Sequence, residues 1–308
     1  MWNGRLFIAY FKAAKIIQNT NIKCAFVSTN SITQGEQAAS VFKPLYERFG
    51  FCIDFAWQTF KWGSESKEQA AVHCVIIGFS SNSKSAKKLF LNNTIVHSPK
   101  HINAYLLEAP DVFIESRNKP ICNVPEVLKG SSPVDGGNLL LTDAEYHELI
   151  AKEPHAEKYI KKFCGAKEYL HNINRWCLWL KDITPADIIC GDANIMMPDA
   201  ALYHFGILSS NVHMAWVRAV CGRIKSDYRY SNDIVYNNFP WCSPTPEQKQ
   251  SIEQTAQAIL NARLLYPDSS LADLYDEVLA TGIAQSTPDE QQGSHAGIWF
   301  SNQKFYRI

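Results

Sequence analysis

The chain has 308 residues, 46% of them hydrophobic, which is enough for about two domains with buried cores. Its 30 basic and 30 acidic side chains cancel, which excludes a strongly basic or strongly acidic polypeptide. The charges are unevenly spread, because residues 247–290 hold eight acidic and two basic residues and leave 28 basic against 22 acidic elsewhere. A basic body with an acidic end is compatible with a polyanionic partner such as DNA.

The cysteines are scattered and form no recognisable framework. There are nine of them, with no CxxC pair, and several lie in apolar runs where a free thiol acts as a small core residue. No zinc site is indicated, and no apolar run reaches the length of a membrane span. An odd number of cysteines without a signal peptide favours a reducing cytoplasm.

The first eighty residues alternate between helical and extended patterns. The apolar periodicity predicts helices over 6–18 and 35–50 and strands over 24–29, 51–60 and 71–79. Pro44 falls inside the second helix, and Gly50 is expected to end it. A polar connection of ten residues joins the last two strands, which is typical of neighbouring strands in one sheet.

Residues 82–102 differ in composition from what precedes them. Four lysines stand among serines and asparagines: Lys84, Lys87, Lys88 and Lys100. This composition predicts a linker, which either lies beside phosphate or is simply a solvated basic segment. An apolar and polar alternation resumes over 102–116, so we place the second domain at 103–245.

The second domain carries mixed signals. Thr142 is expected to cap a helix, with Glu145 at the capping-box position. Residues 157–172 predict a basic, aromatic helix or loop, and 174–183 predict an apolar strand that begins near Arg175. The tryptophans of that strand are expected to pack rather than bind.

The segment 201–241 combines an apolar helix pattern with cations and aromatic rings. The helix is predicted over 211–220, with Gly222 closing it. Within 204–241 there are four basic residues against two aspartates and no glutamate. Cations interleaved with tyrosines suit nucleic acid, since cations contact phosphates and rings stack on bases. The alternative is a packed aromatic core with a solvated basic rim.

Beyond this segment the chain is expected to be helical over 246–285 and irregular over 286–308. Thr245, Pro246 and Glu247 form a helix start, and a second helix is predicted over 268–279. These acidic, amphipathic helices either pack against another part of an enzyme or cap the domain. No role can be assigned to the final segment.

Several stretches of the amino-acid sequence resemble those of a known protein family. LYHFGILSSNVHMAWVRAVCGRIKSDYRYSNDIVYNNFPW closely resembles the end of the target-recognition region in MmeI-like class I AdoMet-dependent DNA adenine methyltransferases, which include the type IIL restriction-modification enzymes. FVSTNSITQGEQ, TFKW and AAVHCVIIGF resemble later methyltransferase blocks, and RWCLWL resembles a target-recognition block. The resemblance implies an α/β protein: the C-terminal half of a Rossmann-like methyltransferase sheet over 1–81, an α+β target-recognition domain and a helical C-terminal segment.

The resemblance also implies methylation of the adenine amino group in a short DNA sequence, and it suggests site residues. An adenine rotated out of the duplex needs an aromatic face, for which Phe60 is the first candidate. Trp62 is the second candidate, because it is two residues further on and lies on the same side if the strand continues. Packing of Phe60 in the sheet core is the alternative. The candidate DNA contacts are Lys61, Lys161, Lys162, Lys167, Asn172, Asn174, Arg175, Arg218, Arg223, Lys225 and Arg229. Arginine and asparagine can read base edges, whereas the lysines suit phosphates.

Two elements of such an enzyme are not found in the sequence: a Gly-rich turn that holds S-adenosyl-L-methionine and an Asn-Pro-Pro-aromatic loop that binds the target amino group. We therefore expect no catalytic residue and no cofactor binding in this chain alone, with double-stranded DNA and an upstream catalytic half, in cis or trans, as its partners. The chain would then be a fragment of a methyltransferase, whether cloned or native. The alternatives are a DNA-binding specificity subunit that acts with a separate catalytic chain, and an inactive remnant.

Overall fold

The computed structural model describes residues 3–62, 72–91, 95–133, 135–179, 188–192, 194–224 and 227–275. The chain divides into two compact units, and neither is continuous in sequence. The first unit comprises Met1–Cys122 and Asn211–Pro240, and the second comprises Asn123–Ser210 and Trp241–Ile308. The expected tail at 286–308 lies outside the described residues, as does the part of the expected helical segment beyond Tyr275.

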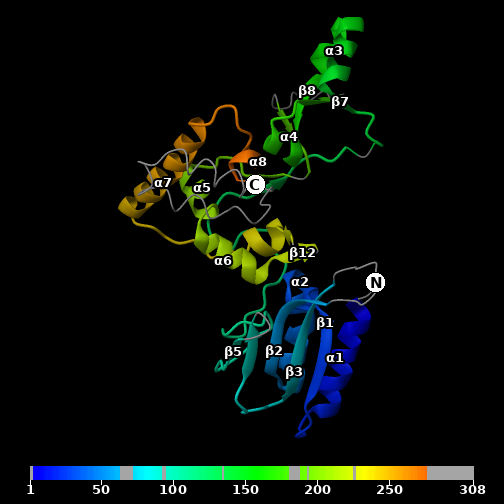
Figure 1. Ribbon diagram of the computed structural model, residues 1–308, viewed down its shortest axis with the longest axis vertical. Helices are drawn as coiled ribbons and strands as arrows, with labels where there is room; N and C mark the ends of the chain where they lie inside the picture. The colour runs from blue at the N-terminus through cyan, green and yellow to red at the C-terminus, as the bar shows by residue number, and fades with distance from the viewer. Residues whose placement is uncertain are drawn as a thin grey trace. The chain divides into compact units, whose positions relative to one another are not determined.

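The first unit is built on a five-stranded sheet (Figure 1). Its elements up to the sheet edge are α1 (Asn3–Ile17), β1 (Cys24–Thr29), the 3-10 helix η1 (Asn30–Thr33), α2 (Gly35–Phe49), β2 (Phe51–Trp62), β3 (Val72–Ser81), β4 (Lys88–Leu91) and β5 (Ile95–His97). The strand order is β1-β3-β2-β4-β5, in which β3 runs antiparallel to both β1 and β2. The helices and strands predicted over 6–79 are all present.

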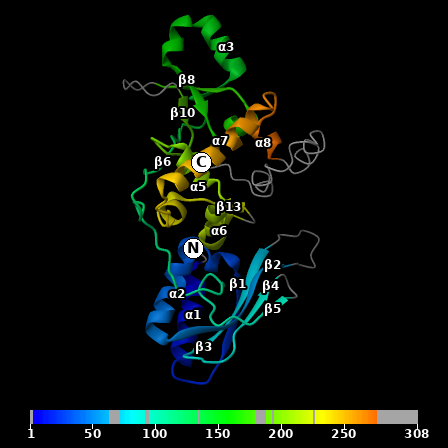
Figure 2. The ribbon, with the colours of Figure 1, turned by 90° about the vertical axis from the view of Figure 1, so that its left-hand side faces the viewer.

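Helices α1 and α2 lie on the same side of this sheet (Figure 2). Tyr10 of α1 and Phe42 of α2 are fully buried against Ile53, Ile77 and Phe79 of the sheet. The second helix ends where the sequence predicted, because Gly50 adopts the left-handed conformation at φ 58°. Alternate residues of β2 and β3 therefore point toward the two helices, and the residues between them point to the opposite face of the sheet.

The opposite face of the sheet is also apolar. Directly paired residues of neighbouring strands point to the same face of a sheet. Three such pairs of β2 and β3 alternate with the core residues and so lie on the face away from the helices: Phe55 with Gly78, Trp57 with Ile76 and Phe60 with Cys74. The ring of Phe55 lies over Gly78, where a β-carbon would come within 2.0 Å of it. Both faces of the sheet are therefore built for packing or binding.

The segment that ends at Cys122, from which the second domain was expected to start at residue 103, belongs to the first compact unit. Ile102, Ala104 and Leu106 are buried among the sheet and helix residues. No helix or strand forms between His97 and Leu128, so the apolar alternation at 102–116 does not mark a strand. The alternation reflects contacts of an irregular segment with the core.

The segment Asn211–Pro240 returns to this unit. It forms α6 (Asn211–Val220), the hairpin strands β12 (Gly222–Ile224) and β13 (Asp227–Arg229) and the π-helix η3 (Asn232–Tyr236). Asn237 Nδ2 donates to Arg117 O at 2.6 Å, and Asn238 Nδ2 donates to Glu115 O at 3.0 Å. Helix α6 forms as predicted, but Gly222 belongs to β12 rather than to the helix end. Gly222 lies against Gly35, which brings β12 close to α2.

A buried histidine fastens α6 within this segment. His213 is 2% exposed, and its Nε2 lies 3.1 Å from the hydroxyl of Tyr230. Burial lowers the pKa of His213 to about 4, so the ring is neutral at physiological pH. The edge of its ring meets Phe239 with the centroids 4.6 Å apart. Much of the aromatic content of 201–241 is therefore core.

The second unit contains a four-stranded sheet and separate helices. Its elements are β6 (Leu128–Lys129), β7 (Leu140–Thr142), α3 (Asp143–Lys152), the 3-10 helix η2 (Pro154–Tyr159), β8 (Ile160–Cys164), α4 (Ala166–His171), β9 (Arg175–Leu178), β10 (Ile188–Cys190), β11 (Ile195–Met196), α5 (Leu202–Leu208), α7 (Pro246–Leu264) and α8 (Leu271–Leu274). The sheet has the order β10-β8-β9-β7. Thr142 and Glu145 form the predicted capping box of α3.

The expectation of a helix or loop over 157–172 is partly wrong. Residues 160–164 form β8, a central strand of the sheet. Ile160 and Phe163 of this strand are buried, and Lys162 between them is exposed. The strand was not predicted because its two lysines interrupt the apolar pattern of so short a segment. Of the strand predicted over 174–183, residues Arg175–Leu178 form β9, which ends before Trp179. Residues 180–183 lie outside the described part of the chain.

Helices α5 and α7 approach each other closely at Gly206. A β-carbon at this position would lie 2.7 Å from Cγ2 of Ile252 and 3.3 Å from Cβ of Ala256. Thr245 caps α7 by accepting a hydrogen bond from the backbone nitrogen of Gln248, as its position before Pro246 predicted. This helix pair holds the second half of the unit together.

Candidate nucleic-acid interface

An aromatic row lies on the face of the first sheet opposite α1 and α2. The rings of Trp57 and Phe90 stack with centroids 4.9 Å apart and planes 8° apart. Phe60 meets Trp57 edge-on at 6.3 Å and is 6.1 Å from Trp62. The register of β2 shifts between Ile53 and Phe55 and again between Trp57 and Phe60, and these bulges keep the rings on one face.

Phe60 lies at the end of this row where strand β2 becomes exposed. Its side chain is half-buried, and Trp62 is 50% exposed. Strand β2 continues to Trp62, so the two candidate stacking residues share a face as the sequence reading required. Neither belongs to the core beneath α1 and α2. The two rings can therefore offer an aromatic surface to a flat ligand.

The hairpin β12–β13 separates two of the candidate arginines. Arg223 pairs with Tyr228 and Gly222 pairs with Arg229 in the antiparallel register, so the two arginines point to opposite faces of the hairpin. The Arg223 guanidinium lies 4.3 Å from the centroid of the Tyr228 ring and donates to its hydroxyl at 3.1 Å. Arg229 is exposed. Lys225 lies outside the described residues.

Two further cationic candidates belong to the same unit. Arg218 lies on the exposed side of α6, whose buried side carries His213, Met214 and Val217. Lys61 is exposed at the end of β2, between Phe60 and Trp62. The first unit thus carries the two aromatic candidates together with Lys61, Arg218, Arg223 and Arg229.

The remaining candidates gather around α4 and β9 in the second unit. Arg175 is only partly exposed, and its NH1 lies 3.4 Å from Oε1 of the buried Glu168. Asn172 ends α4 in the left-handed conformation at φ 52°. Lys167, Asn172 and Asn174 are exposed. Arg175 and Asn172 therefore already have structural roles, whereas Lys167 and Asn174 are available to a ligand.

Trp176 packs, as the sequence indicated. Its ring stacks on Tyr146 with centroids 4.1 Å apart, and its Nε1 donates to Asp143 at 2.9 Å. Trp179 contacts the small core of Phe163, Cys177 and Ile189. Lys162 is exposed on β8 and Lys161 is half-buried.

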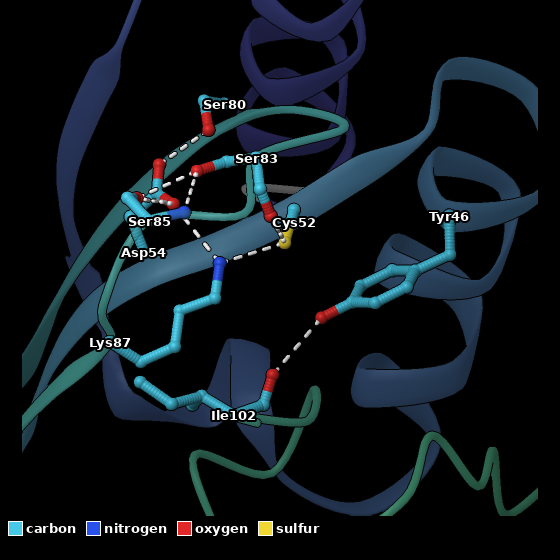
Figure 3. A network of polar contacts seen from close by, with 8 residues as sticks. All are labelled: Tyr46, Cys52, Asp54, Ser80, Ser83, Ser85, Lys87 and Ile102. Carbon is cyan, nitrogen blue, oxygen red and sulfur yellow. Dashed lines mark hydrogen bonds and ion pairs between the residues drawn. The ribbon is translucent and has the colours of Figure 1, made fainter. Parts of the chain in front are cut away.

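A buried polar network was not foreseen from the sequence (Figure 3). Lys87 Nζ lies 3.1 Å from Oδ1 of Asp54, with both side chains 7% exposed. Ser80 Oγ donates to Oδ2 of Asp54 at 2.5 Å, and Ser85 Oγ donates to Oδ1 at 3.1 Å. Lys87 therefore belongs neither to a phosphate contact nor to a solvated linker. The sequence feature that could have indicated this network is Asp54, the single charged residue in the otherwise apolar stretch FCIDFAW. A charge in a buried strand needs a partner.

The electrostatics of this network favour both charges. Burial acts to raise the pKa of Asp54, but hydrogen bonds from Ser80, Ser83 and Lys87 outweigh it and the pKa falls below its usual value. Burial likewise acts to lower the pKa of Lys87, while its bonds to Cys52 and Asp54 raise it overall. The pair is therefore ionised at neutral pH.

Within the described residues, no group of three or more His, Cys, Asp or Glu side chains is placed to hold a metal ion. None of the described helices has the length and apolar character needed to cross a membrane.

Comparisons with known proteins agree with this architecture. Family models for MmeI match the chain in order: the DNA-methyltransferase domain over 6–91, the target recognition domain over 108–188 and 182–243, and the C-terminal domain over 244–285. DNA methyltransferase A of Bacillus subtilis (strain 168) is 33% identical, across 87% of this chain and 38% of its own length. The solved structure of the type IIL restriction-modification enzyme MmeI in complex with DNA is 36% identical, with a TM-score of 0.81 over 89% of this chain and 46% of that one.

These matches define a protein of the DNA methyltransferase class. The methyltransferase match covers the five-stranded sheet up to residue 91, and the target-recognition match follows it in the chain. The chain belongs to the MmeI-like DNA methyltransferases, with methyltransferase, target-recognition and C-terminal parts. It spans less than half the length of the two relatives that it matches.

Proposed function

We propose that this chain is the target-recognition and partial catalytic portion of a site-specific DNA adenine methyltransferase of a restriction-modification system. The observation that carries the proposal is the ordered match of three MmeI domain models across residues 6–285. The recognition domain would extend over 103–245 in sequence, with the methyltransferase portion before it and the helical segment after it. Restriction-modification acts on cellular DNA, so the protein would work in the cytoplasm.

The sheet of the first unit would be the C-terminal half of a Rossmann-like methyltransferase sheet. Two features support this reading: β3 is inserted between β1 and β2 and runs antiparallel to both, and the face opposite α1 and α2 is apolar. Sheets with apolar residues on both faces are normally covered on both sides. The catalytic half of the enzyme, in cis or in trans, would supply that cover.

Phe60 would stack on the adenine rotated out of the duplex, with Trp62 as the second candidate. Such a base has lost its neighbours in the helix and needs a π-face to replace them. Phe60 stands at the exposed end of an aromatic row and is braced by Trp57. Lys61, between the two rings in sequence, would contact a nearby phosphate.

DNA contacts would come from both units. In the first unit Arg218 and Arg229 are exposed cations, and in the second Lys167 and Asn174 are exposed beside Arg175. Cations bound to phosphates provide affinity, whereas arginine and asparagine at base edges provide specificity. S-adenosyl-L-methionine would be held in the complete enzyme by residues outside this sequence, so methyl transfer would require both parts.

The test is duplex binding by the chain alone, measured by fluorescence anisotropy over a salt series. We expect affinity to fall steeply with salt, because each phosphate contact releases counterions. Absence of binding at low salt would overturn the recognition role. Adding the catalytic part of a relative, or the upstream sequence of the same gene, should then produce AdoMet-dependent methylation of a defined adenine.

The alternative of a specificity subunit predicts the same binding but a different source of catalysis. An upstream sequence in the same reading frame that encodes the Gly-rich turn would identify a fragment of one enzyme. A separate gene that encodes it, and whose product co-purifies with this chain, would identify a two-chain enzyme. An inactive remnant would bind duplex DNA in neither case.

A further inference from the structure

The buried network also contains the thiol of Cys52, in addition to the ion pair of Asp54 and Lys87. Lys87 Nζ lies 2.9 Å from the sulfur of Cys52, as well as 3.1 Å from Asp54 Oδ1 (Figure 3). A separation of 2.9 Å is usual between nitrogen and oxygen but short for nitrogen and the larger sulfur atom. The two atoms are close enough for a single intervening oxygen atom to be bonded to both.

We propose that Cys52 and Lys87 form a reversible covalent N–O–S cross-link when the protein meets a peroxide. The cross-link would join the start of β2 to the residue just before β4. This modification site is independent of the proposed function, since neither residue is among the candidate DNA contacts.

The chemistry balances with two molecules of hydrogen peroxide. The thiol of Cys52 first attacks one peroxide, so that an S–O bond forms, the O–O bond breaks and water leaves, giving a sulfenic acid. The lysine nitrogen then bonds to the sulfenic oxygen while the second peroxide accepts two electrons and is reduced to two waters. Altogether the thiol and the protonated amine consume two peroxides and yield S–O–NH, three waters and one proton.

The surroundings hold both reacting atoms in place. Asp54 holds the lysine from one side, and the carboxylate itself is fixed by Ser80 and Ser85. The sulfur of Cys52 also lies 3.6 Å from Ser83 O. Because the lysine side chain is 7% exposed, the nitrogen cannot swing away to solvent without breaking these contacts. After cross-linking, Asp54 keeps its two serine hydrogen bonds.

The experiment uses the full chain, purified in reducing buffer, transferred to buffer without reductant and treated with hydrogen peroxide. Peptide mass spectrometry should find the Cys52 and Lys87 peptides joined, with a mass greater than their sum by one oxygen less two hydrogens. Dithiothreitol should separate them again. Cys52→Ser should abolish the joined peptide, and Lys87→Arg, which keeps a cation beside Asp54, should leave Cys52 as a sulfenic or sulfinic acid.

Other oxidation products decide against the proposal. Cys242, which is exposed, serves as the internal control for peroxide reaction. If Cys242 is oxidised in the wild-type chain while Cys52 stays reduced, or gains oxygen without joining Lys87, the cross-link does not form. This comparison is made in the wild-type chain, so it does not depend on either variant folding.

Discussion

Arg223 and Tyr228 face each other across the hairpin β12–β13, with the guanidinium 4.3 Å above the ring and a 3.1 Å hydrogen bond to its hydroxyl. Arg229, one residue beyond Tyr228, points to the other face and is exposed. Both arginines are candidate DNA contacts, and Arg223 also packs on Tyr228. Their substitution should therefore have different consequences.

Arg229→Ala should weaken binding to every duplex to a similar extent and reduce the slope of log affinity against log salt by about 1, as the loss of one phosphate contact requires. Arg223→Ala should lower affinity in the same way and also lower the free energy of unfolding by about 0.5–2 kcal/mol, through loss of the cation–π contact. Fluorescence anisotropy and urea unfolding measure the two effects.

Arg223→Lys provides the matched control for the first prediction, because it keeps the charge while losing the planar contact with Tyr228. Unchanged salt dependence in Arg229→Ala would remove that residue from the DNA interface. Unchanged binding but reduced stability in Arg223→Ala would leave Arg223 with a structural role alone.

Phe60→Ala, placed in a complete enzyme, should reduce methyl transfer more than duplex binding. Stacking on a base contributes about 1–3 kcal/mol, so the rate should fall by about 5- to 150-fold. Single-turnover methylation and anisotropy on the same duplex give the comparison. Phe60→Trp should retain most activity, and Trp62→Ala tests the second candidate. Equal losses of rate and affinity in Phe60→Ala would count against stacking.

The ion pair between Asp54 and Lys87 should make stability depend on pH at both extremes. The pKa of Asp54 is lowered from 3.8, so its contribution is complete above that pH and is lost as the pH falls through the folded-state value. The pKa of Lys87 is raised from 10.5, so its contribution is complete below that pH and is lost as the pH rises through the folded-state value. Urea unfolding in reducing buffer should therefore show a plateau between these limits.

Asp54→Asn should cost about 3–5 kcal/mol at neutral pH, because it leaves the buried lysine without its counter-charge. The double variant Asp54→Asn and Lys87→Met should recover part of this loss, since no buried charge remains. A single variant as stable as the wild type would mean that water reaches the lysine and that the pair is not isolated from solvent.

Gly206→Ala should destabilise the second unit by about 1–3 kcal/mol, as overpacking does where a β-carbon has no space. The added methyl would meet Ile252 at 2.7 Å. Combining it with Ile252→Ala should restore less than the full loss, because the backbone oxygen of Ile252 is also near, at 3.2 Å. Thermal unfolding is the measurement, and an unchanged midpoint would mean that α5 and α7 separate without cost.

The sequence predicted three strands of the first sheet, β1, β2 and β3, because each is a regular pattern between clear stop signals. Strands β4 and β5 were missed, because they lie within residues 82–102, which were predicted to be a linker. Gly50 ends α2 through its left-handed conformation, and Thr142 and Thr245 cap their helices through hydrogen bonds with residues three positions further on. These local signals need no knowledge of the tertiary structure. The candidate stacking pair, Phe60 and Trp62, was placed on one face by the same kind of reasoning.

The remaining features depend on contacts between residues far apart in the chain. Lys87 appeared to belong to a solvated lysine run because its partner Asp54 lies 33 positions earlier. Strand β8 was missed because its core contacts come from β9 and β10 rather than from its own lysine-rich sequence. The return of residues 211–240 to the first unit rests on side chains such as Asn237 and Asn238, whose partners lie 120 and 123 positions away.

The discontinuous first unit has a consequence for exchanging parts between relatives. A graft of residues 103–245 as one block would move Asn211–Pro240 together with residues 115–117, and it would separate both from the rest of the first unit. The ion pair of Lys43 with Glu115 and the close approach of Gly222 to Gly35 would then depend on foreign residues. A graft limited to Asn123–Ser210 would leave both pieces of the first unit in the recipient. Such a graft would separate α5 from α7, which pack together at Gly206, so Trp241–Ile308 has to be transferred with it. Chimeras that exchange the whole second unit should keep their native contacts and stay folded, whereas linear domain swaps would require the donor segment to match a foreign surface.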